Sequence, residues 1–482
     1  MAGASPSESA ADRYLAARRD HWNRAARITD RWSGWGGAYH RRLQQAYRAS
    51  VPPGQRILEL GCGLGDLLAA LEPELGVGVD ISEEMLVRAA QRHPHLRFVN
   101  ADVHDLRGID GPFDVVILSD LVNELWDVQA VLEQLEPLMT SRTRILFNLF
   151  SRLWQLPLGL ARRLRLARPA LSQNWLTVED LHNLLRLTDL EAIRTWQECL
   201  LPLPVPLLAP LANRFLVRLW PFRLFALSNF VVARPAPTRS NQPEPLVSVV
   251  VPARNEEGNV EQIFLRTPEM GHGTELVFVE GHSTDGTFAA IEREIARHPN
   301  RRAKLLRQPG VGKGDAVRQG FAAATGEVLM ILDADLTVPP EDLPRFYDAL
   351  REGKGELING VRLVYPMEAE AMRFINLLGN KFFSLAFSWL LGQPIKDTLC
   401  GTKVLLRADY DRIAENRAYF GDFDPFGDFD LIFGAAKLNL RLTDMPVRYR
   451  QRTYGETNIQ RWKHGWLLLR MVLFAARRIK FG

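Results

Sequence analysis

Short apolar runs that end in polar or acidic residues alternate with helical stretches along most of this chain of 482 residues. The alternation starts near Arg56, stops at the polar, proline-rich segment 234–244 and then begins again. Strands that alternate with helices form parallel sheets covered by helices, so each series predicts one α/β domain. We therefore expect an α/β fold with two domains, residues 1–233 and 246–482, separated by a linker at 234–245.

The composition is that of a globular protein and argues against several classes of function. Sixty Lys and Arg residues against 56 Asp and Glu residues leave a net charge of +4, so we expect no nucleic-acid partner. Cys62, Cys199 and Cys400 are far apart and lack metal-ligand spacing, which predicts free thiols in a reducing compartment. The N-terminus has no signal-peptide pattern, and we expect a cytoplasmic protein. The oligomeric state stays open.

Three apolar stretches are too short to cross a bilayer, which takes about 18 to 20 residues. They are residues 199–213, with four prolines, residues 382–391, and residues 466–476, which Arg470 interrupts. Stretches of this length are usually buried core. Trp, Phe and Leu interleaved with Arg and Lys are also typical of segments that lie in the membrane interface. The sequence leaves both interpretations open, and the second predicts peripheral association with the inner face of the membrane.

A glycine-rich turn follows the first predicted strand, in the segment RILELGCGLGDLLAAL. Gly61, Gly63 and Gly65 lie between a strand that ends at Leu60 and a helix that begins at Asp66. Glycines let a ligand approach the backbone closely and leave the N–H groups of the helix exposed to it. A dinucleotide site has a similar turn, but its GxGxxG pattern is replaced here by GxGxG.

Acidic residues follow the next three strands. The strand VGVGVD ends in Asp80, where a carboxylate can accept hydrogen bonds from a ribose, and RFVNAD ends in Asp102, near a possible adenine amine. The fourth strand leads to Asp120, Asn123 and Glu124. Ligands of open α/β sheets bind at this carboxyl edge, so these residues predict a site there.

The motifs ELGCG with GDLL behind it, VDIS, NADVHDL and FDVV follow one another in an order that resembles the class I methyltransferases, which use S-adenosylmethionine. The resemblance covers most of residues 1–235 and implies a Rossmann-like domain, over which residues 12–50 form a helical cap. It implies that the amino-acid end of the cofactor is held by Glu59, Gly61, Gly63, Gly65 and Asp66. The same resemblance assigns the ribose to Asp80 and the adenine to Asp102 with Val103.

Methyl transfer needs alignment of the acceptor with the methyl group and no metal. A hydroxyl acceptor also needs a general base, for which His40, Asp120 and Glu124 are candidates, with Tyr39 beside them. The proline-rich insertion 201–222 precedes the last strand and would cover the site with apolar surface. This indicates a lipid-like or membrane-presented acceptor.

The second series contains a strand, VLMIL, that leads into Asp333 and Asp335. Two carboxylates one residue apart at the end of a strand can both face a divalent ion such as Mg²⁺ or Mn²⁺. Such an ion, with Lys313 of the loop VGKG, would offset the charge of a departing nucleoside diphosphate. An isolated DxD is often a surface turn, but the apolar strand before this one favours a functional site.

From Val247 onward the chain resembles the family 2 glycosyltransferases of the GT-A fold, most closely the dolichyl-phosphate sugar synthase branch. The matching motifs are VVVPARNEE, STDGT, GKGDAVRQG, LDADL, KDTLCGTKVLLR and PVRYRQRTYGET. The resemblance implies a nucleotide-sugar donor, inversion at the anomeric carbon and membrane-facing apolar helices. It assigns the nucleotide to Pro252, Arg254, Glu256 and Glu280, the metal to Asp333 and Asp335, and phosphates to Arg362, Arg373 and Arg452.

One departure from the family pattern concerns the nucleotide. Many relatives read DDGSTDGT where this chain reads EGHSTDGT, so that Gly281 replaces the second acid. The sequence therefore leaves the nucleotide and the sugar open.

The acceptor of the sugar decides whether a base is needed. A polyprenyl phosphate arrives as an anion and needs none, whereas a hydroxyl needs one, and Asp397 or Asp428 would be the candidates. Asp397 is equally suited to cap the segment DTLCGTK. We expect a bifunctional enzyme that glycosylates a lipid carrier or isoprenoid lipid and methylates a related lipid or sugar. The alternatives are a glycosyltransferase with a non-catalytic docking domain and a scaffold of lipid assembly.

Overall fold

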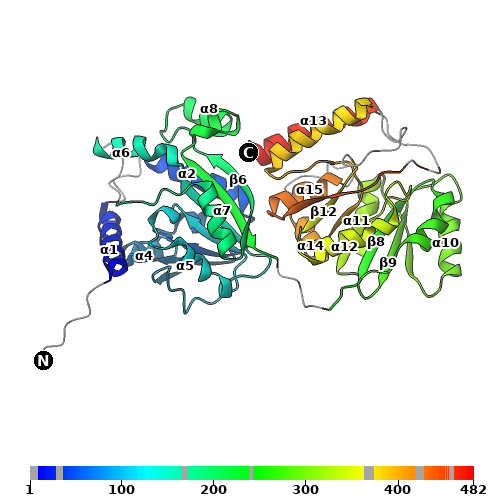
Figure 1. Ribbon diagram of the computed structural model, residues 1–482, viewed down its shortest axis with the longest axis horizontal. Helices are drawn as coiled ribbons and strands as arrows, with labels where there is room; N and C mark the ends of the chain where they lie inside the picture. Colours follow the sequence, from blue (N-terminus) through cyan, green and yellow to red (C-terminus); the bar gives the residue numbers. More distant parts are fainter. Residues whose placement is uncertain are drawn as a thin grey trace. The chain divides into compact units, whose positions relative to one another are not determined.

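The computed structural model describes residues 9–28, 36–164, 171–237, 243–362, 374–417, 428–450, 452, 454 and 461–481. Two compact units divide the chain, the first made of Met1–Ala236 with Phe481–Gly482 and the second of Pro237–Lys480. Each unit holds one seven-stranded sheet between helices (Figure 1). The predicted α/β fold class is confirmed.

The first sheet has the strand order β3-β2-β1-β4-β5-β7-β6. Its central strands pair in parallel, and β7 runs antiparallel to both β5 and β6. The strands are β1 (Arg56–Leu60), β2 (Leu75–Asp80), β3 (Arg97–Asn100), β4 (Val115–Ser119), β5 (Arg144–Phe150), β6 (Leu190–Glu198) and β7 (Ser228–Pro235).

Helices cover both faces of the first sheet. They are α1 (Ala10–Ile28), α2 (Gly36–Ser50), α3 (Asp66–Ala70), α4 (Glu83–Arg92), α5 (Val128–Glu133), α6 (Gln155–Arg163), α7 (Val178–Leu187) and α8 (Leu208–Arg214), with short turns η2 (Val122–Glu124), η3 (Glu136–Leu138), η4 (Arg152–Trp154), η5 (Leu216–Arg218) and η6 (Phe222–Phe225). Successive residues of a strand point to opposite faces. Ile57 accordingly belongs to one apolar core and Leu58 to the other.

The second sheet has the order β10-β9-β8-β11-β13-β12-β14. Strands β10, β9, β8 and β11 are parallel, β13 is antiparallel to both of its neighbours, and β12 pairs in parallel with β14. The strands are β8 (Val247–Ala253), β9 (Thr274–Glu280), β10 (Arg302–Arg307), β11 (Val328–Ile331), β12 (Leu357–Val361), β13 (Lys403–Leu406) and β14 (Leu442–Pro446).

The helices of the second unit also pack on both faces of their sheet. They are α9 (Val260–Arg266), α10 (Thr287–Arg297), α11 (Lys313–Ala323), α12 (Leu343–Arg351), α13 (Phe374–Leu391), α14 (Arg407–Glu415), α15 (Asp428–Lys437) and α16 (Arg461–Ala475), with shorter turns η7 (Glu257–Asn259), η8 (Pro340–Asp342) and η10 (Ala476–Lys480). Val249 and Val251 face one core and Val250 the other, which explains why β8 is apolar throughout.

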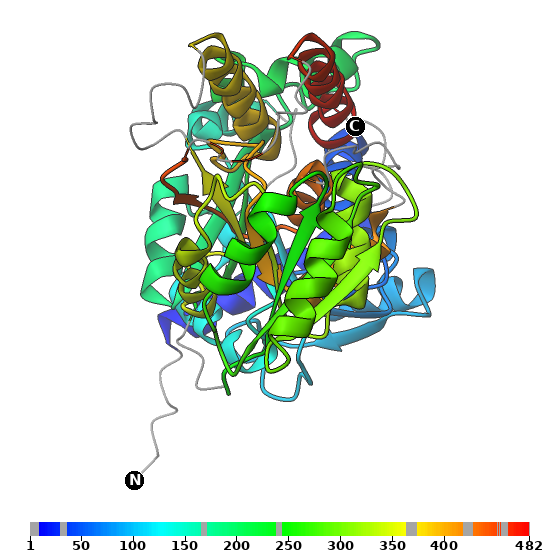
Figure 2. The same ribbon diagram turned by 90° about the vertical axis from the view of Figure 1, so that its right-hand side faces the viewer.

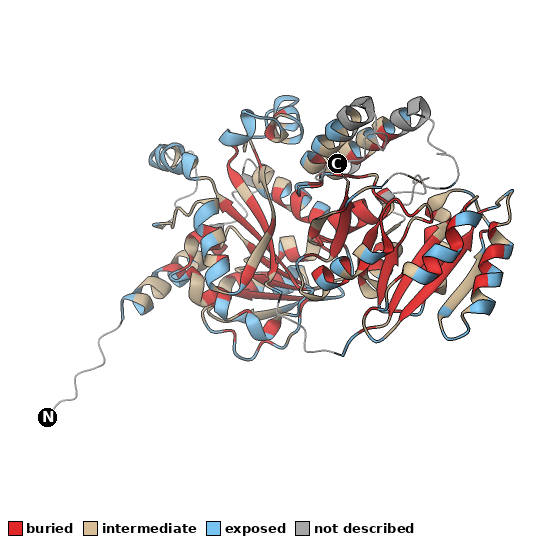
Figure 3. Cartoon of the chain, turned by 45° about the vertical axis from the view of Figure 1, so that its right-hand side comes forward, coloured by how far each residue is buried: buried red, intermediate tan, exposed pale blue. Residues whose placement is uncertain are grey.

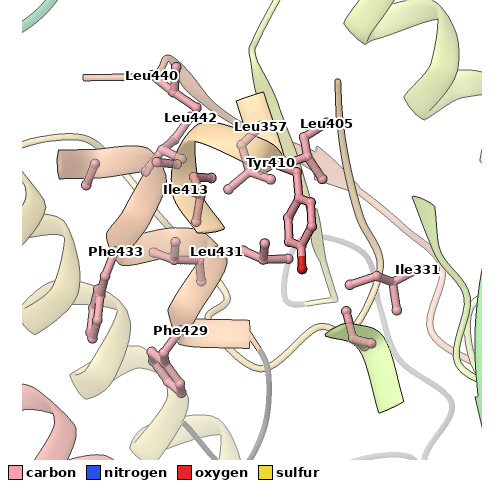
Figure 4. Packing of buried hydrophobic residues seen from close by; sticks show 14 of the residues in the cluster. Ile331, Leu357, Leu405, Tyr410, Ile413, Phe429, Leu431, Phe433, Leu440 and Leu442 are labelled. Carbon is pink, nitrogen blue, oxygen red and sulfur yellow. The ribbon is translucent and has the colours of Figure 1, made fainter. Parts of the chain in front are cut away.

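Buried side chains of α14 and α15 close one face of the second sheet. Figure 4 shows Tyr410 and Ile413 of α14 beside Leu431 of α15, near Leu357 and Leu405 of the strands. Helices α13 and α16 contact each other and lie at one end of this unit (Figure 2). Among the described residues, no helix has both the length and the apolar character needed to span a membrane.

Candidate functional site

The glycine-rich turn of the first unit joins β1 to α3 and adopts backbone conformations that favour glycine. Gly61 and Gly65 have φ values of +70° and +72°. A Cβ atom on Gly61 would lie 2.8 Å from Leu121 Cδ1, and one on Gly65 would lie 2.7 Å from Phe98 Cζ. Gly63, between them, has φ +52°. The turn therefore keeps its N–H groups close to the carboxyl edge of the sheet.

Asp80 ties the end of β2 to this turn. Its Oδ2 accepts a hydrogen bond of 2.8 Å from the Gly63 N–H, and its Oδ1 accepts one of 2.8 Å from the Ser82 N–H. Burial raises the pKa of Asp80, although these backbone bonds oppose the shift. The carboxylate predicted to hold a ribose is thus rigidly placed beside the turn.

At the same place, Glu59 has a buried carboxyl oxygen without a hydrogen-bond partner among the described residues. Its side chain is 2% exposed, and Oε2 makes no hydrogen bond within the described parts of the chain. Burial raises the pKa of Glu59 well above its usual value. A buried oxygen without a partner costs free energy unless a ligand supplies a donor. A positively charged amino group fits this requirement, so the residues present suit the amino-acid end of S-adenosylmethionine.

Histidines hold the other two acids that the resemblance assigns to the cofactor. Asp102 Oδ1 accepts from the His104 N–H at 3.0 Å and lies 2.7 Å from His104 Nδ1. Burial alone would raise the pKa of Asp102, but the bonds from His104 hold it below its usual value. Val103 is buried in the core. Asp66 is about half exposed, and its Oδ1 lies 2.8 Å from His93 Nε2.

A buried hydrogen-bond network lies at the end of β4. Tyr39 of α2 donates to Asp120 Oδ1 at 2.9 Å, and its hydroxyl lies 2.8 Å from Ser228 Oγ. Asn148 also donates to Asp120 Oδ1, and Tyr47 donates to Asn148 Oδ1 at 2.7 Å. The structure therefore brings the predicted Tyr39 and Asp120 together with three residues that the sequence analysis missed. The only signal for Asn148 was a polar residue in the apolar strand RILFNLF.

Asp120 has two properties of a reactive group. Its φ of +55° is uncommon for a residue with a side chain, and strained conformations of this kind occur at active sites. Burial raises its pKa to about 7, although hydrogen bonds from Tyr39 and Asn148 oppose the shift. A carboxylate that titrates near neutrality suits a general base.

His40 and Glu124, the other candidates for a base, and the neighbouring Asn123 have different surroundings. His40 is exposed, with its ring edge-on to Tyr39. Glu124 accepts a hydrogen bond of 2.7 Å from Gln173 Nε2. The Asn123 side chain donates to the Asn174 carbonyl at 2.6 Å. Of these residues, Asp120 best combines burial with a hydroxyl partner.

In the second unit, cationic side chains surround the two aspartates after β11. Lys313, the first residue of α11, lies 2.5 Å from Asp333 Oδ1. Arg452 Nη2 donates to Asp335 Oδ2 and to Glu256 Oε1, both at 3.0 Å. Burial would raise the pKa of Asp333, but Lys313 holds it below its usual value. The hard oxygen atoms of these two carboxylates suit Mg²⁺ or Mn²⁺.

The turns after β8 and β9 are joined by hydrogen bonds. Asn255 Oδ1 accepts from the Thr284 N–H at 2.8 Å, and the Asn255 N–H donates to Ser283 Oγ at 3.0 Å. Within the second turn, Glu280 Oε1 accepts from the Ser283 N–H at 2.5 Å. Burial raises the pKa of Glu256 to about 7, although Arg452 opposes the shift. Of two further predicted nucleotide residues, Pro252 lies in β8 and is half-buried, and Arg254 follows β8 and is exposed.

Gly281 replaces the acid of the family pattern and lies beside a glutamine. A Cβ atom at this position would lie 2.9 Å from Gln308 Oε1. Gln308 is buried and donates to the Gly312 carbonyl at 2.7 Å. An amide thus lies next to the position of the missing carboxylate.

Asp397 is fully engaged by hydrogen bonds. Arg362 donates to both carboxylate oxygens, from Nε at 2.7 Å and from Nη2 at 2.9 Å. The backbone N–H groups of Arg362 and Leu399 also donate to it, and the residue is 1% exposed. Burial would raise the pKa of Asp397, but Arg362 holds it low. This geometry suits a positioning residue. Arg373 and the Asp428 side chain lie outside the described residues.

Gly401 lies directly against the pair of Asp333 and Lys313. A Cβ atom at Gly401 would be 2.1 Å from Asp333 Oδ2 and 2.1 Å from Lys313 Nζ. Only a residue without a side chain fits here while the ion pair keeps its position. This glycine belongs to the motif KDTLCGTK, in which no local pattern predicts its role.

Comparisons with known proteins match a family to each half of the chain. Residues 57–141 match the family described as a methyltransferase domain, and residues 248–413 match the family described as glycosyl transferase family 2. The chain joins a methyltransferase domain to a family 2 glycosyltransferase domain. Both resemblances seen in the sequence are confirmed.

Several relatives in sequence are named as transferases of sugars. Glycosyltransferase AglJ of Haloferax volcanii is 28% identical over 46% of this chain and 69% of its own length. An undecaprenyl-phosphate 4-deoxy-4-formamido-L-arabinose transferase of Edwardsiella ictaluri is 37% identical over 44% of this chain and 62% of its own length. A dolichol-phosphate mannosyltransferase of Pyrococcus furiosus is 31% identical over 28% of this chain and 38% of its own length. The matches thus span 38% to 69% of these relatives.

Solved structures are similar to each half of the chain. Glucosyl-3-phosphoglycerate synthase from Mycobacterium tuberculosis is 20% identical, with a TM-score of 0.36 over 49% of this chain and 81% of that one. Magnesium protoporphyrin IX methyltransferase from Synechocystis is 19% identical, with a TM-score of 0.33 over 46% of this chain and all of that one.

The buried ion pair of Arg362 and Asp397 is expected to stabilise the glycosyltransferase domain. Asp397→Asn leaves the Arg362 guanidinium buried without a counter-ion, so we expect the free energy of unfolding to fall by about 3–5 kcal/mol. The pair's contribution is present at neutral pH and is lost as the pH falls through the lowered pKa of Asp397. Urea denaturation monitored by circular dichroism measures the change.

The control for this variant is Asp105→Asn, which removes an exposed ion pair with Arg107. We expect little change from it, because solvent screens exposed pairs. Equal effects of the two substitutions would show that the buried pair has no special role.

Proposed function

We propose that the glycosyltransferase domain transfers a sugar from a nucleotide-sugar donor to a polyprenyl phosphate, with inversion. The observation that carries this proposal is the pair Asp333 and Asp335 at the end of a buried strand, next to Lys313. These carboxylates would hold Mg²⁺ or Mn²⁺, which stabilises the departing diphosphate when bound. Lys313 adds a positive charge on the same side.

The hydrogen bonds that already occupy Asp397 support a phosphate acceptor. A phosphate oxygen attacks the anomeric carbon as an anion, so no proton has to be removed. Asp397, the described candidate for a base, already accepts four hydrogen bonds. Two of the relatives reported above are named for undecaprenyl-phosphate and dolichol-phosphate substrates. Arg452, with Arg373, would bind the phosphates of donor or acceptor.

Arg452 lies between the residues assigned to the nucleotide and those assigned to the metal. It connects Glu256, assigned to the nucleotide, with Asp335, assigned to the metal. Asp335 would help to hold the divalent ion, and Arg452 would place its positive charge beside the phosphates of the donor. Pro252, Arg254 and Glu280 would contact the base and ribose from the joined turns.

The methyltransferase domain would transfer a methyl group from S-adenosylmethionine to a hydroxyl of a lipid or a sugar. The acceptor oxygen forms the new bond to the methyl carbon as the bond from that carbon to sulfur breaks, and the hydroxyl proton passes to Asp120. Glu59 and the glycine turn would orient the cofactor, and Tyr39 would orient Asp120. His40 lies next to this network as an acceptor-side residue.

Both activities would take place at a membrane surface on the cytoplasmic side. Leu385 and Phe382 of α13 and Trp466 of α16 are large apolar side chains exposed to solvent. Exposed apolar and aromatic side chains on helices are typical of proteins that lie on a bilayer. The lipid part of a polyprenyl phosphate requires such a position.

Removal of either metal-site carboxylate tests the sugar transfer. We expect Asp333→Ala and Asp335→Ala to lower metal-dependent transfer from a nucleotide-sugar panel to polyprenyl phosphate by about 1,000-fold, because a bound ion contributes several kcal/mol to stabilisation of the transition state. Mass spectrometry of the lipid product measures the rate. Asp348→Ala, at an exposed position of α12, is the matched control. Retained transfer in the two variants would refute the assignment.

Gly401 tests the same site without removal of a charge. In Gly401→Ala the new methyl group displaces Asp333 or Lys313, and a shift of this size is expected to lower kcat/KM by about 100-fold. Gly379→Ala, where no atom lies within 4 Å of the added carbon, should leave the rate unchanged. Thermal unfolding must show that both variants are folded. Full activity of Gly401→Ala would mean that the ion pair has no part in transfer.

The raised pKa of Asp120 leads us to expect that methyl transfer depends on pH. The base is its ionised form, so the rate with labelled S-adenosylmethionine and membrane lipid should rise through about pH 7. Asp120→Asn should remove this rise and lower the rate by about 100-fold or more. Calorimetry should find unchanged cofactor binding in the variant. Binding without transfer by the wild-type protein would instead favour a docking domain.

A further inference from the structure

Two segments of the methyltransferase domain expose many large apolar side chains. Residues 152–164 contain η4 and α6, and residues 199–227 contain α8, η5 and η6. Leu156 is 84% exposed in the first segment, and in the second Leu207 is 88% and Trp220 is 73% exposed. Globular proteins rarely expose contiguous apolar surface of this kind unless it contacts a partner.

The two segments form one surface, here named the roof surface. The Trp154 indole N–H donates to the Phe225 carbonyl at 2.9 Å, and the Ser151 N–H donates to the Leu227 carbonyl at 2.7 Å. Figure 1 shows α6 and α8 at the same end of this domain. Figure 3 shows in pale blue that much of both segments is exposed.

The roof surface adjoins the network around Asp120. Strand β5 ends at Phe150, directly before the first segment, and β7 begins at Ser228, directly after the second. The register pairs Phe150 with Ser228, and the Ser228 hydroxyl contacts Tyr39. An acceptor that approaches Asp120 from this edge of the sheet would therefore pass the roof surface.

The charges of the roof surface all have one sign. Each segment contains three arginines, and neither contains an aspartate or a glutamate. Arg152, Arg163 and Arg223 are exposed beside the apolar side chains. Exposed leucine and aromatic residues next to arginines match the boundary between acyl chains and anionic headgroups. Trp220 and Phe225 have the amphipathic or aromatic character of interface anchors.

We propose that the methyltransferase domain docks on an anionic bilayer through the roof surface and takes its methyl acceptor, a hydroxyl-bearing lipid, directly from that bilayer. The proposal deepens the proposed methyl transfer and rests on it for the chemistry at Asp120. It assigns a membrane contact to this domain that does not depend on α13 and α16 of the other domain.

Vesicle flotation of the full chain tests the docking. The roof variant carries Leu156→Glu, Leu207→Glu and Trp220→Glu, and the matched control carries Val87→Glu, Leu187→Glu and Leu265→Glu, at exposed apolar positions of α4, α7 and α9. Both are placed on a background of Leu385→Glu and Trp466→Glu, which weakens any contact made by α13 and α16. The vesicles are phosphatidylcholine with and without phosphatidylglycerol.

We expect the roof variant to bind phosphatidylglycerol vesicles about tenfold or more weakly than the control, because three apolar contacts become repulsive. Binding of the control should fall with added salt and without phosphatidylglycerol. Methyl transfer to lipid in the vesicles should fall in parallel, while calorimetric binding of S-adenosylmethionine stays the same.

Equal vesicle binding by the roof variant and the control would overturn the docking proposal. A change of oligomeric mass in the roof variant, measured by light scattering, with unchanged vesicle binding would also overturn it and would assign the surface to a second copy. If the wild-type protein binds no S-adenosylmethionine, the proposed methyl transfer fails, whereas the vesicle measurement still decides the docking.

Discussion

Parallel strand pairing is the constraint on which both sites of this chain depend. In the methyltransferase domain, β1 pairs in parallel with β2 and β4, so the glycine turn, Asp80 and Asp120 all follow strands at one edge. In the glycosyltransferase domain, β8 pairs in parallel with β9 and β11, which brings Glu256, Glu280 and Asp333 to one edge. Hydrogen bonding along the strands therefore collects polar residues that are far apart in the chain. Without that alignment, the same acids would be scattered.

Burial of several carboxyl groups at one edge of a sheet costs free energy, and the two domains offset this cost with different groups. The glycosyltransferase domain surrounds its carboxylates with cations, as Lys313 does for Asp333 and Arg362 for Asp397. The methyltransferase domain uses hydrogen bonds to Asp80 and Asp120 and leaves one oxygen of Glu59 without a donor. A burial penalty that the protein does not offset can be offset by a cationic ligand. This difference fits an anionic donor held through a metal in one domain and a cationic cofactor in the other.

Both domains expose large apolar side chains. Exposed large side chains lie on the roof surface of one domain and on α13 and α16 of the other. Each domain thus has its own apolar surface beside basic or aromatic residues. Under the membrane contact proposed above for each domain, a bilayer would supply a lipid to either site without any requirement for direct transfer between the sites.

The sequence by itself determined the order of the elements, the α/β fold class and both families, because apolar periodicity and glycine motifs are local properties of the chain. It also predicted which strand ends carry acids, and the structure places those acids there. The partners of the acids were decided only by the tertiary structure. Asp397 was predicted as a possible base or cap, yet Arg362, 35 residues away, occupies it. Tyr39 reaches Asp120 from 81 residues away and Arg452 reaches Glu256 from 196, contacts that depend on how helices and turns pack. Side-chain partners over such separations follow from the packed chain as a whole, and no local pattern encodes them.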